Sequence, residues 1–170
     1  MGTGHIRTIC LALLTVALLF IDPNAAAFCA LGTVASYKFG DGELTKTRAL
    51  PSGASAVTST AIDLGEDTTG TFVTDCELVI NAPAVTTGML GDAATIKYDI
   101  VTSDTSDLTT SPTIIAKEVI VQTGAGGAGA AATEARFRFP TNVKRYVGVR
   151  ATKSATGDAS SVSMTVALRF

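Results

Sequence analysis

The feature that most constrains this fold is the alternation of apolar and polar side chains in short runs, from about Ala56 to the end of the chain. In "EARFRF", Ala135, Phe137 and Phe139 alternate with three charged residues. Successive side chains of a strand point to opposite faces, so such a period of two indicates a half-buried β-strand. Polar and glycine-rich turns separate the runs.

Seven strands are expected, with an eighth if "ELTKTRAL" (43–50) pairs. They are "AVTSTAIDL" (56–64), "TDCELVIN" (74–81), "TIKYDIVT" (95–102), "IIAKEVIV" (114–121), "EARFRF" (134–139), "YVGVRAT" (146–152) and "SVSMTVALRF" (161–170). Parallel strands would need long, usually helical, crossovers, and no segment after residue 33 has helical periodicity. The pattern therefore predicts an all-β, antiparallel sandwich or barrel over residues 56–170.

Composition narrows the classes of function. Hydrophobic residues make up 46% of the chain, which is enough apolar material for a core, and charged residues make up 16%. The net charge is −2, and the only adjacent basic residues are Lys144 and Arg145. Because no basic stripe exists to neutralise a phosphate backbone, we do not expect nucleic-acid binding.

The glycine run "TGAGGAGAAATEARFRF" (123–139) contains G-x-G-x-x-G at Gly124, Gly126 and Gly129. That motif binds a dinucleotide only where the turn opens a helix, whose N-terminal amides meet the pyrophosphate. Here a strand pattern follows. No acidic residue lies about 20 positions further on to hold a ribose. We therefore expect a flexible connection between strands and no cofactor.

The first 33 residues differ from the rest and have three interpretations. His5 and Arg7 precede an apolar run, and "AAA" (25–27) supplies a cleavage signal, as in a secretory signal peptide. The segment also suits a buried N-terminal arm. Alternatively, the natural start is Val34, read from a GTG codon. Residues 34–55 are expected to form an extended arm in front of the sandwich.

Residues that usually carry catalysis are scarce. The only histidine is His5, no G-x-S-x-G elbow surrounds a serine, and three cysteines (Cys10, Cys29 and Cys76) match no metal motif. A Cys29–Cys76 disulfide requires an oxidising compartment, and a buried thiol is the simpler interpretation of Cys76. We therefore expect no enzyme activity and no small-molecule substrate.

Two acidic loops are the remaining candidates for a hard cation. Asp104 and Asp107 lie in "TSDTSDLTTSP" and Glu66–Asp67 in "GEDTTG". Neither loop has the spacing of a calcium loop, so solvated turns are the favoured interpretation and no metal is expected.

Four segments stand out together: "SAVTSTAIDLG" (55–65), "TIKYDIVTSDTSDLTTSPTIIAKEVI" (95–120), "KRYVGVRATKSATGDASSVSMTVALRF" (144–170) and the opening "SYKFGDGELTKTRALP" (36–51). They resemble the jelly-roll cement, or decoration, proteins of tailed-phage capsids. The resemblance implies a jelly-roll-like β-sandwich of about eight strands. The apolar N-terminal segment departs from this family.

The resemblance also implies a structural role without catalytic residues. Such proteins bind the outer surface of the capsid, bridge neighbouring capsomers and assemble as symmetric homo-oligomers, so the expected partners are the major capsid protein and further copies of this chain. We expect the arm to make intersubunit contacts through Tyr37, Phe39, Leu44 and Leu50. If the leader is a true signal peptide, the alternative is a secreted, surface or periplasmic β-sandwich that binds or adheres.

Overall fold

The computed structural model describes residues 44–65 and 76–170, and all structural statements below concern these residues. They form nine strands and no helix. The strands are β1 (Thr45–Ala49), β2 (Ala56–Thr58), β3 (Ile62–Asp63), β4 (Glu77–Ala82), β5 (Thr95–Ser103), β6 (Thr113–Thr123), β7 (Thr133–Arg138), β8 (Tyr146–Lys153) and β9 (Ser163–Arg169).

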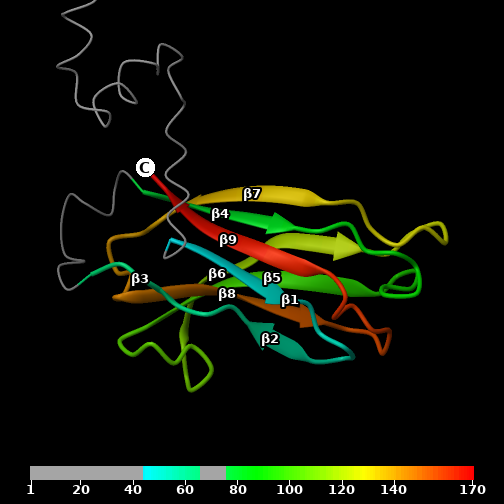
Figure 1. The fold of residues 1–170 in the computed structure, drawn as a ribbon, viewed down its shortest axis with the longest axis horizontal. Coiled ribbons are helices and arrows are strands. Elements are labelled where there is room, and N and C mark those ends of the chain that lie inside the picture. The colour runs from blue at the N-terminus through cyan, green and yellow to red at the C-terminus, as the bar shows by residue number, and fades with distance from the viewer. Residues whose placement is uncertain (1–43, 66–75) are drawn as a thin grey trace, which may run out of the picture. The chain divides into compact units, whose positions relative to one another are not determined.

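The strands make two antiparallel sheets (Figure 1). The first has the order β1-β9-β4-β7, and the second has the order β2-β8-β5-β6, with the short strand β3 also pairing with β8. In Figure 1, β7, β4, β9 and β1 follow one another across the picture in the order of the first sheet. All ladders are antiparallel, as the absence of helical crossovers predicted.

The strand order is that of a jelly roll. The pairs β1–β9, β2–β8, β4–β7 and β5–β6 are those of one long hairpin folded in the middle, with β3 as an addition. Rolling that hairpin brings β9 beside β4 and β8 beside β5, and both ladders are present. The expectation of an antiparallel, jelly-roll-like β-sandwich is therefore confirmed.

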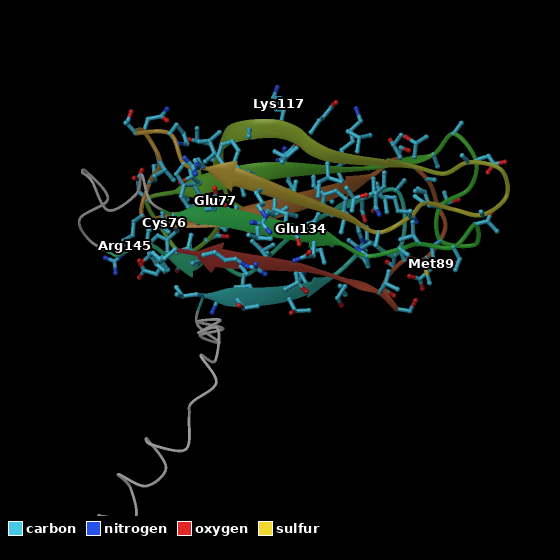
Figure 2. All side chains as sticks on the ribbon, turned by 90° about the horizontal axis from the view of Figure 1, so that it is seen from above. Cys76, Glu77, Met89, Lys117, Glu134 and Arg145 are labelled. Carbon is cyan, nitrogen blue, oxygen red and sulfur yellow. The ribbon has the colours of Figure 1, made fainter. Side chains whose placement is uncertain are left out.

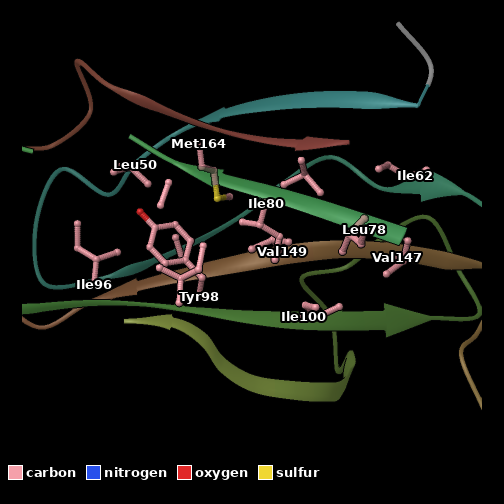
Figure 3. Packing of buried hydrophobic residues seen from close by; sticks show 14 of the residues in the cluster. Leu50, Ile62, Leu78, Ile80, Ile96, Tyr98, Ile100, Val147, Val149 and Met164 are labelled. Carbon is pink, nitrogen blue, oxygen red and sulfur yellow. The ribbon is translucent and has the colours of Figure 1, made fainter. Parts of the chain in front are cut away.

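The core lies between the two sheets and consists of the alternate residues that the sequence pattern predicted (Figure 3). In β5, the inward residues Ile96, Tyr98 and Ile100 are fully buried. The first sheet contributes Leu78, Ile80, Met164 and Val166, and the second adds Val147, Val149 and Ala151. Burying these side chains is the main stabilising term, at about 25 cal/mol for each Å² of apolar surface.

One buried side-chain amide connects the two sheets through the interior. The buried side chain of Gln122 in β6 accepts a hydrogen bond from the hydroxyl of Tyr98 at 2.9 Å. Its amide nitrogen donates to the carbonyl oxygens of Pro83 at 2.7 Å and Ala131 at 2.8 Å. Pro83 follows β4 and Ala131 precedes β7, so one amide links the second sheet to the first.

Strand bounds agree with the sequence pattern for β4 to β9, and two differences occur nearer the N-terminus. The run expected over 56–64 is divided into β2 and β3, because Ser59 interrupts the ladder between them: its hydroxyl accepts the N–H of Val149 at 3.0 Å. The sandwich also starts before residue 56, since β1 pairs with β9 over five positions. Residues 45–49 are thus a strand of the sheet, although they fell within the expected arm.

The glycine run joins β6 in the second sheet to β7 in the first. It lies directly on the 85–94 loop: Val85 and Ala130 exchange two backbone hydrogen bonds of 2.9 Å. Gly129 has a φ of +82°, and a Cβ there would overlap the Val85 carbonyl oxygen. The backbone of the neighbouring loop therefore contacts this connection closely, and the strand expected after it is confirmed as β7.

Candidate interaction surface

The described residues contain no group of three or more His, Cys, Asp or Glu side chains placed to hold a metal ion. Asp104 instead accepts a hydrogen bond from the ammonium group of Lys144 at 2.6 Å. Asp107 accepts from both the backbone N–H and the hydroxyl of Thr109, at 2.8 and 2.6 Å. Glu66 and Asp67 lie outside the described residues. No helix in residues 44–65 and 76–170 is long and apolar enough to cross a membrane.

The outer face of the second sheet is partly covered by its own chain. The loop after β5 returns over the sheet and places Leu108, only 3% exposed, against Gly148 in β8. Gly148 lies opposite the fully buried Val101, which points away from the main core. Leu108, Val101 and Gly148 therefore form a small second core outside the sandwich.

Hydrogen bonds around Asp107 hold this covering loop. The hydroxyl of Thr109 is the main cause that lowers the pKa of Asp107 from 3.8 to about 2, with contributions from Thr110. These hydrogen bonds thus stabilise the charged form of the Asp107 carboxylate.

Paired charges lie on another part of that outer face. Lys97 donates to Glu118 at 2.7 Å, and this carboxylate raises the pKa of Lys97 above its usual range. Asp99 accepts the backbone N–H of Glu118 at 2.8 Å and the guanidinium of Arg150 at 3.2 Å. Each acidic group here already has a partner within the chain.

The outer face of the first sheet carries small side chains on β1 and most of β9, and charged side chains on β7. The pairing register shows which of its residues lie in one row across the four strands, because directly opposite residues in a sheet share a face. One row is Thr47–Thr165–Asn81–Glu134 from β1 to β7, and the row beside it is Thr45–Ala167–Val79–Arg136. Alanine, threonine and asparagine, together with the fully buried Val79, thus fill the middle of this face. We call this surface, formed by the outward residues of β1, β9, β4 and β7, the open face.

A shallow hollow lies at one end of the open face. It encloses about 420 Å³ and is lined by Asn81, Ala82, Pro83, Ala132, Thr133, Glu134, Ser163 and Thr165. Short polar side chains and backbone at such a hollow suit contact with another protein surface, since they offer hydrogen bonds at little entropic cost.

Charge gathers at the opposite end of the open face. There Arg169, Glu77 and Arg138 form one row across β9, β4 and β7, and Arg138 donates to Glu77 at 3.0 Å. Glu77 lies on the sheet beside β7 in Figure 2. The open face therefore has an arginine-rich end and a small, polar end. This asymmetry is what a surface needs to fix the orientation of a partner.

The structure describes two of the four predicted contact residues. Leu50 is 2% exposed and lies in the core, and the partly buried Leu44 packs against that core. Their apolar side chains are thus placed within their own sandwich, and their role between subunits stays a prediction. Tyr37 and Phe39 lie outside the described residues. The structure does not bring these four together in one site.

Sequence reasoning missed the covering loop and the buried amide. Leu108 is the single large apolar residue in "TSDTSDLTTSP", and an isolated leucine in a polar loop was the available signal. Gln122 lies two positions after Ile120 and so on the same inward face of the strand, and this spacing was the available signal for its burial. Cys76, expected to be buried, is 1% exposed, and Cys29 lies outside the described residues.

Comparison of the sequence with protein-family models and with curated proteins found no match.

Proposed function

We propose that this chain is a structural virion protein that binds the outer surface of a phage capsid and cements neighbouring capsomers. The observation that carries the proposal is the open face: a polar sheet surface of small and charged side chains on a jelly roll whose other outer face is partly covered by Leu108. The sequence resemblance to jelly-roll decoration proteins supports the same role. Because the jelly roll also occurs in lectin domains and cupins, fold alone does not separate these functions.

Binding through the open face suits a repetitive lattice. A capsid shell presents the same site many times, so weak polar contacts add up when several copies are linked. The small side chains allow close approach over the sheet, while the arginine-rich end fixes the orientation. The major capsid protein is the proposed partner.

Co-sedimentation with mature capsid shells of the phage that encodes the chain tests this function. Ala49 and Ala56 are a matched pair: both are exposed, and both lie on the outer face of an edge strand, in β1 and β2 respectively. Ala49→Trp should weaken co-sedimentation strongly, because the indole stands on the open face. Ala56→Trp, on the other sheet, should leave it unchanged.

The alternative, a secreted binding or adhesion module, predicts different covalent features and no binding to capsid shells. Under that alternative the chain is cleaved after Ala27, carries a Cys29–Cys76 bond and does not sediment with shells. Intact mass of the native protein, measured with and without reductant, distinguishes the two functions. Finding those three features together would exclude the capsid role.

A further inference from the structure

Four strand edges border the two sheets, and three of them are blocked against further pairing. An open edge presents unpaired backbone N–H and C=O groups, which another chain can use to extend the sheet. In β1, Lys46 and Arg48 lie opposite the core residues Val166 and Met164 and so carry charge on the inward side. Inward charges of this kind hinder pairing with a second strand.

The two edges of the second sheet are blocked by geometry. Strand β2 has only three residues. Strand β6 is interrupted by a bulge opposite Asp99, where Glu118 has a φ of +52°, and Lys117 points away from the body of the molecule (Figure 2). Very short strands and bulges both prevent a partner strand from pairing along the edge.

Strand β7 has none of these features. Its six residues pair with β4 without a register shift, and among the described residues β4 is its only ladder partner. Its inward residues are uncharged, and Phe137 is only partly buried, against the core. The edge is therefore regular, open and bordered by a half-covered aromatic ring.

The outward charges of β7 select one partner and one register. Glu134 and Arg136 lie two positions apart on the same face and form an ion pair of 3.0 Å within the strand. If a second β7 pairs antiparallel about a two-fold axis at Ala135, each Glu134 lies opposite Arg136 of the second copy, and Phe137 lies opposite Thr133. A two-fold axis at Arg136 would also give two Glu134–Arg138 pairs, but it sets the two Arg136 side chains against each other, which is unfavourable. The axis at Ala135 has no like-charged pair.

We propose that two copies of this chain associate through β7, with Ala135 on the two-fold axis, to form one continuous eight-stranded sheet. An antiparallel two-fold of this kind is perpendicular to the sheet, so both open faces lie on the same side. The dimer doubles the area of that surface. The inference is independent of the capsid role, because self-association is measured without capsids.

Charge reversal in the full chain tests the dimer. Glu134→Arg and Arg136→Glu should each weaken dimerisation roughly tenfold in sedimentation equilibrium, since each places like charges opposite one another twice. Combining them restores complementary pairs, so the double variant should dimerise as the wild type does. Arg48→Glu, which changes the net charge by the same amount as Arg136→Glu on the opposite edge of the sheet, should have no effect.

A cysteine at the axis tests the register. Directly opposite Cα atoms in antiparallel strands lie about 4.5–5.5 Å apart, which is within the range of a disulfide. Ala135→Cys should therefore give a cross-linked dimer on oxidation, with the bond found by peptide mass spectrometry between the two introduced residues, while Thr133→Cys should not. A monomeric wild-type chain, a dimer that neither single reversal weakens, or failure of Ala135→Cys to cross-link would overturn the proposal.

Discussion

At the scale of single residues, Gln122 shows how a polar group becomes part of an apolar interior. All three of its hydrogen bonds join different parts of the chain, to Tyr98, Pro83 and Ala131. Burial raises the pKa of the Tyr98 phenol well above its usual range, so this hydroxyl remains a donor at all ordinary pH values. A satisfied amide of this kind fixes how the two sheets align.

Replacing Gln122 by leucine should lower the free energy of unfolding by about 1–3 kcal/mol, because the Pro83 and Ala131 carbonyls and the Tyr98 hydroxyl lose their partner. Tyr98→Phe should cost about 1 kcal/mol, since it removes one bond from the same group. Urea unfolding measures both. Val121→Ala, on the exposed face of the same strand, is the control and should change stability by less than about 0.5 kcal/mol. Equal effects of Gln122→Leu and Val121→Ala would refute the role of the amide.

The carboxyl group of Asp107 should titrate near pH 2 in the folded chain, against its ordinary value of 3.8. A folded pKa below the unfolded value means that the stabilisation is present above about pH 4 and is lost as the pH falls through 2. Carboxyl chemical shifts in an NMR titration measure this. Thr109→Val, which removes the hydroxyl donor, should raise the pKa toward 3.8; an unchanged titration would show that the turn does not hold the charge.

At the scale of elements, the connection from β6 to β7 is determined by close backbone approach. Gly129 lies against Val85, and Gly124 lies against the carbonyl of Gly91, so neither position has room for a Cβ. Packing between two loops therefore accounts for the first and last glycines of the G-x-G-x-x-G motif, and a positive φ accounts for Gly126. The motif is followed by the strand β7, whereas a phosphate site of this kind requires the N-terminus of a helix.

Gly129→Ala should lower the free energy of unfolding by more than about 2 kcal/mol, because the methyl group meets backbone that cannot rotate away. Gly126→Ala is the matched control: its φ is +61°, but its Cβ position is open. The control should cost only about 1 kcal/mol, the left-handed penalty alone. Thermal unfolding distinguishes them, and equal losses would mean that the close approach to Val85 does not matter.

The alternation of side chains predicted the strands from β4 to β9 because each has one buried and one exposed face. Inward residues such as Ile96, Tyr98 and Ile100 could thus be read from the sequence. The same pattern could not predict features set by distant contacts. The break at Ser59 depends on a hydrogen bond to Val149, and the cover of Leu108 over Gly148 depends on a pairing register between β5 and β8.

The candidate surface was less accessible to sequence reasoning than the fold. Leu44 and Leu50 are apolar residues in a segment that the pattern assigned to an arm, and both pack on the chain's own core. The open face combines small residues of β1 and β9 with charged residues of β7, from strands that are far apart in the sequence, and no local motif marks such a set. Only the strand order brings them together.

At the scale of the whole molecule, two N-terminal deletions test where the arm ends and the sandwich begins. A variant lacking residues 1–43 retains all nine strands and should unfold cooperatively with a stability close to that of the full chain. A variant lacking residues 1–52 also loses β1 and Leu50, whose removal from the core alone is worth about 2–5 kcal/mol, and should not fold stably. Circular dichroism during heating compares them. Equal stability of the two variants would refute the assignment of β1 to the sandwich.

The shorter deletion also tests the arm. It removes Tyr37 and Phe39 and leaves the sandwich whole, so we expect weaker decoration of capsid shells with an unchanged fold. Full decoration by the variant lacking residues 1–43 would show that the arm makes no contact between subunits.

The central claim is that the open face contacts the capsid shell. A cryo-EM reconstruction of mature shells incubated with the full chain tests it most directly, because the two outer faces of the sandwich are easily told apart by the covering loop at Leu108. We predict density for the jelly roll on the outside of the shell, with β1, β9, β4 and β7 toward the capsid and the Leu108 loop toward solvent. Bare shells, or a jelly roll bound with the Leu108 side toward the capsid, would contradict the claim.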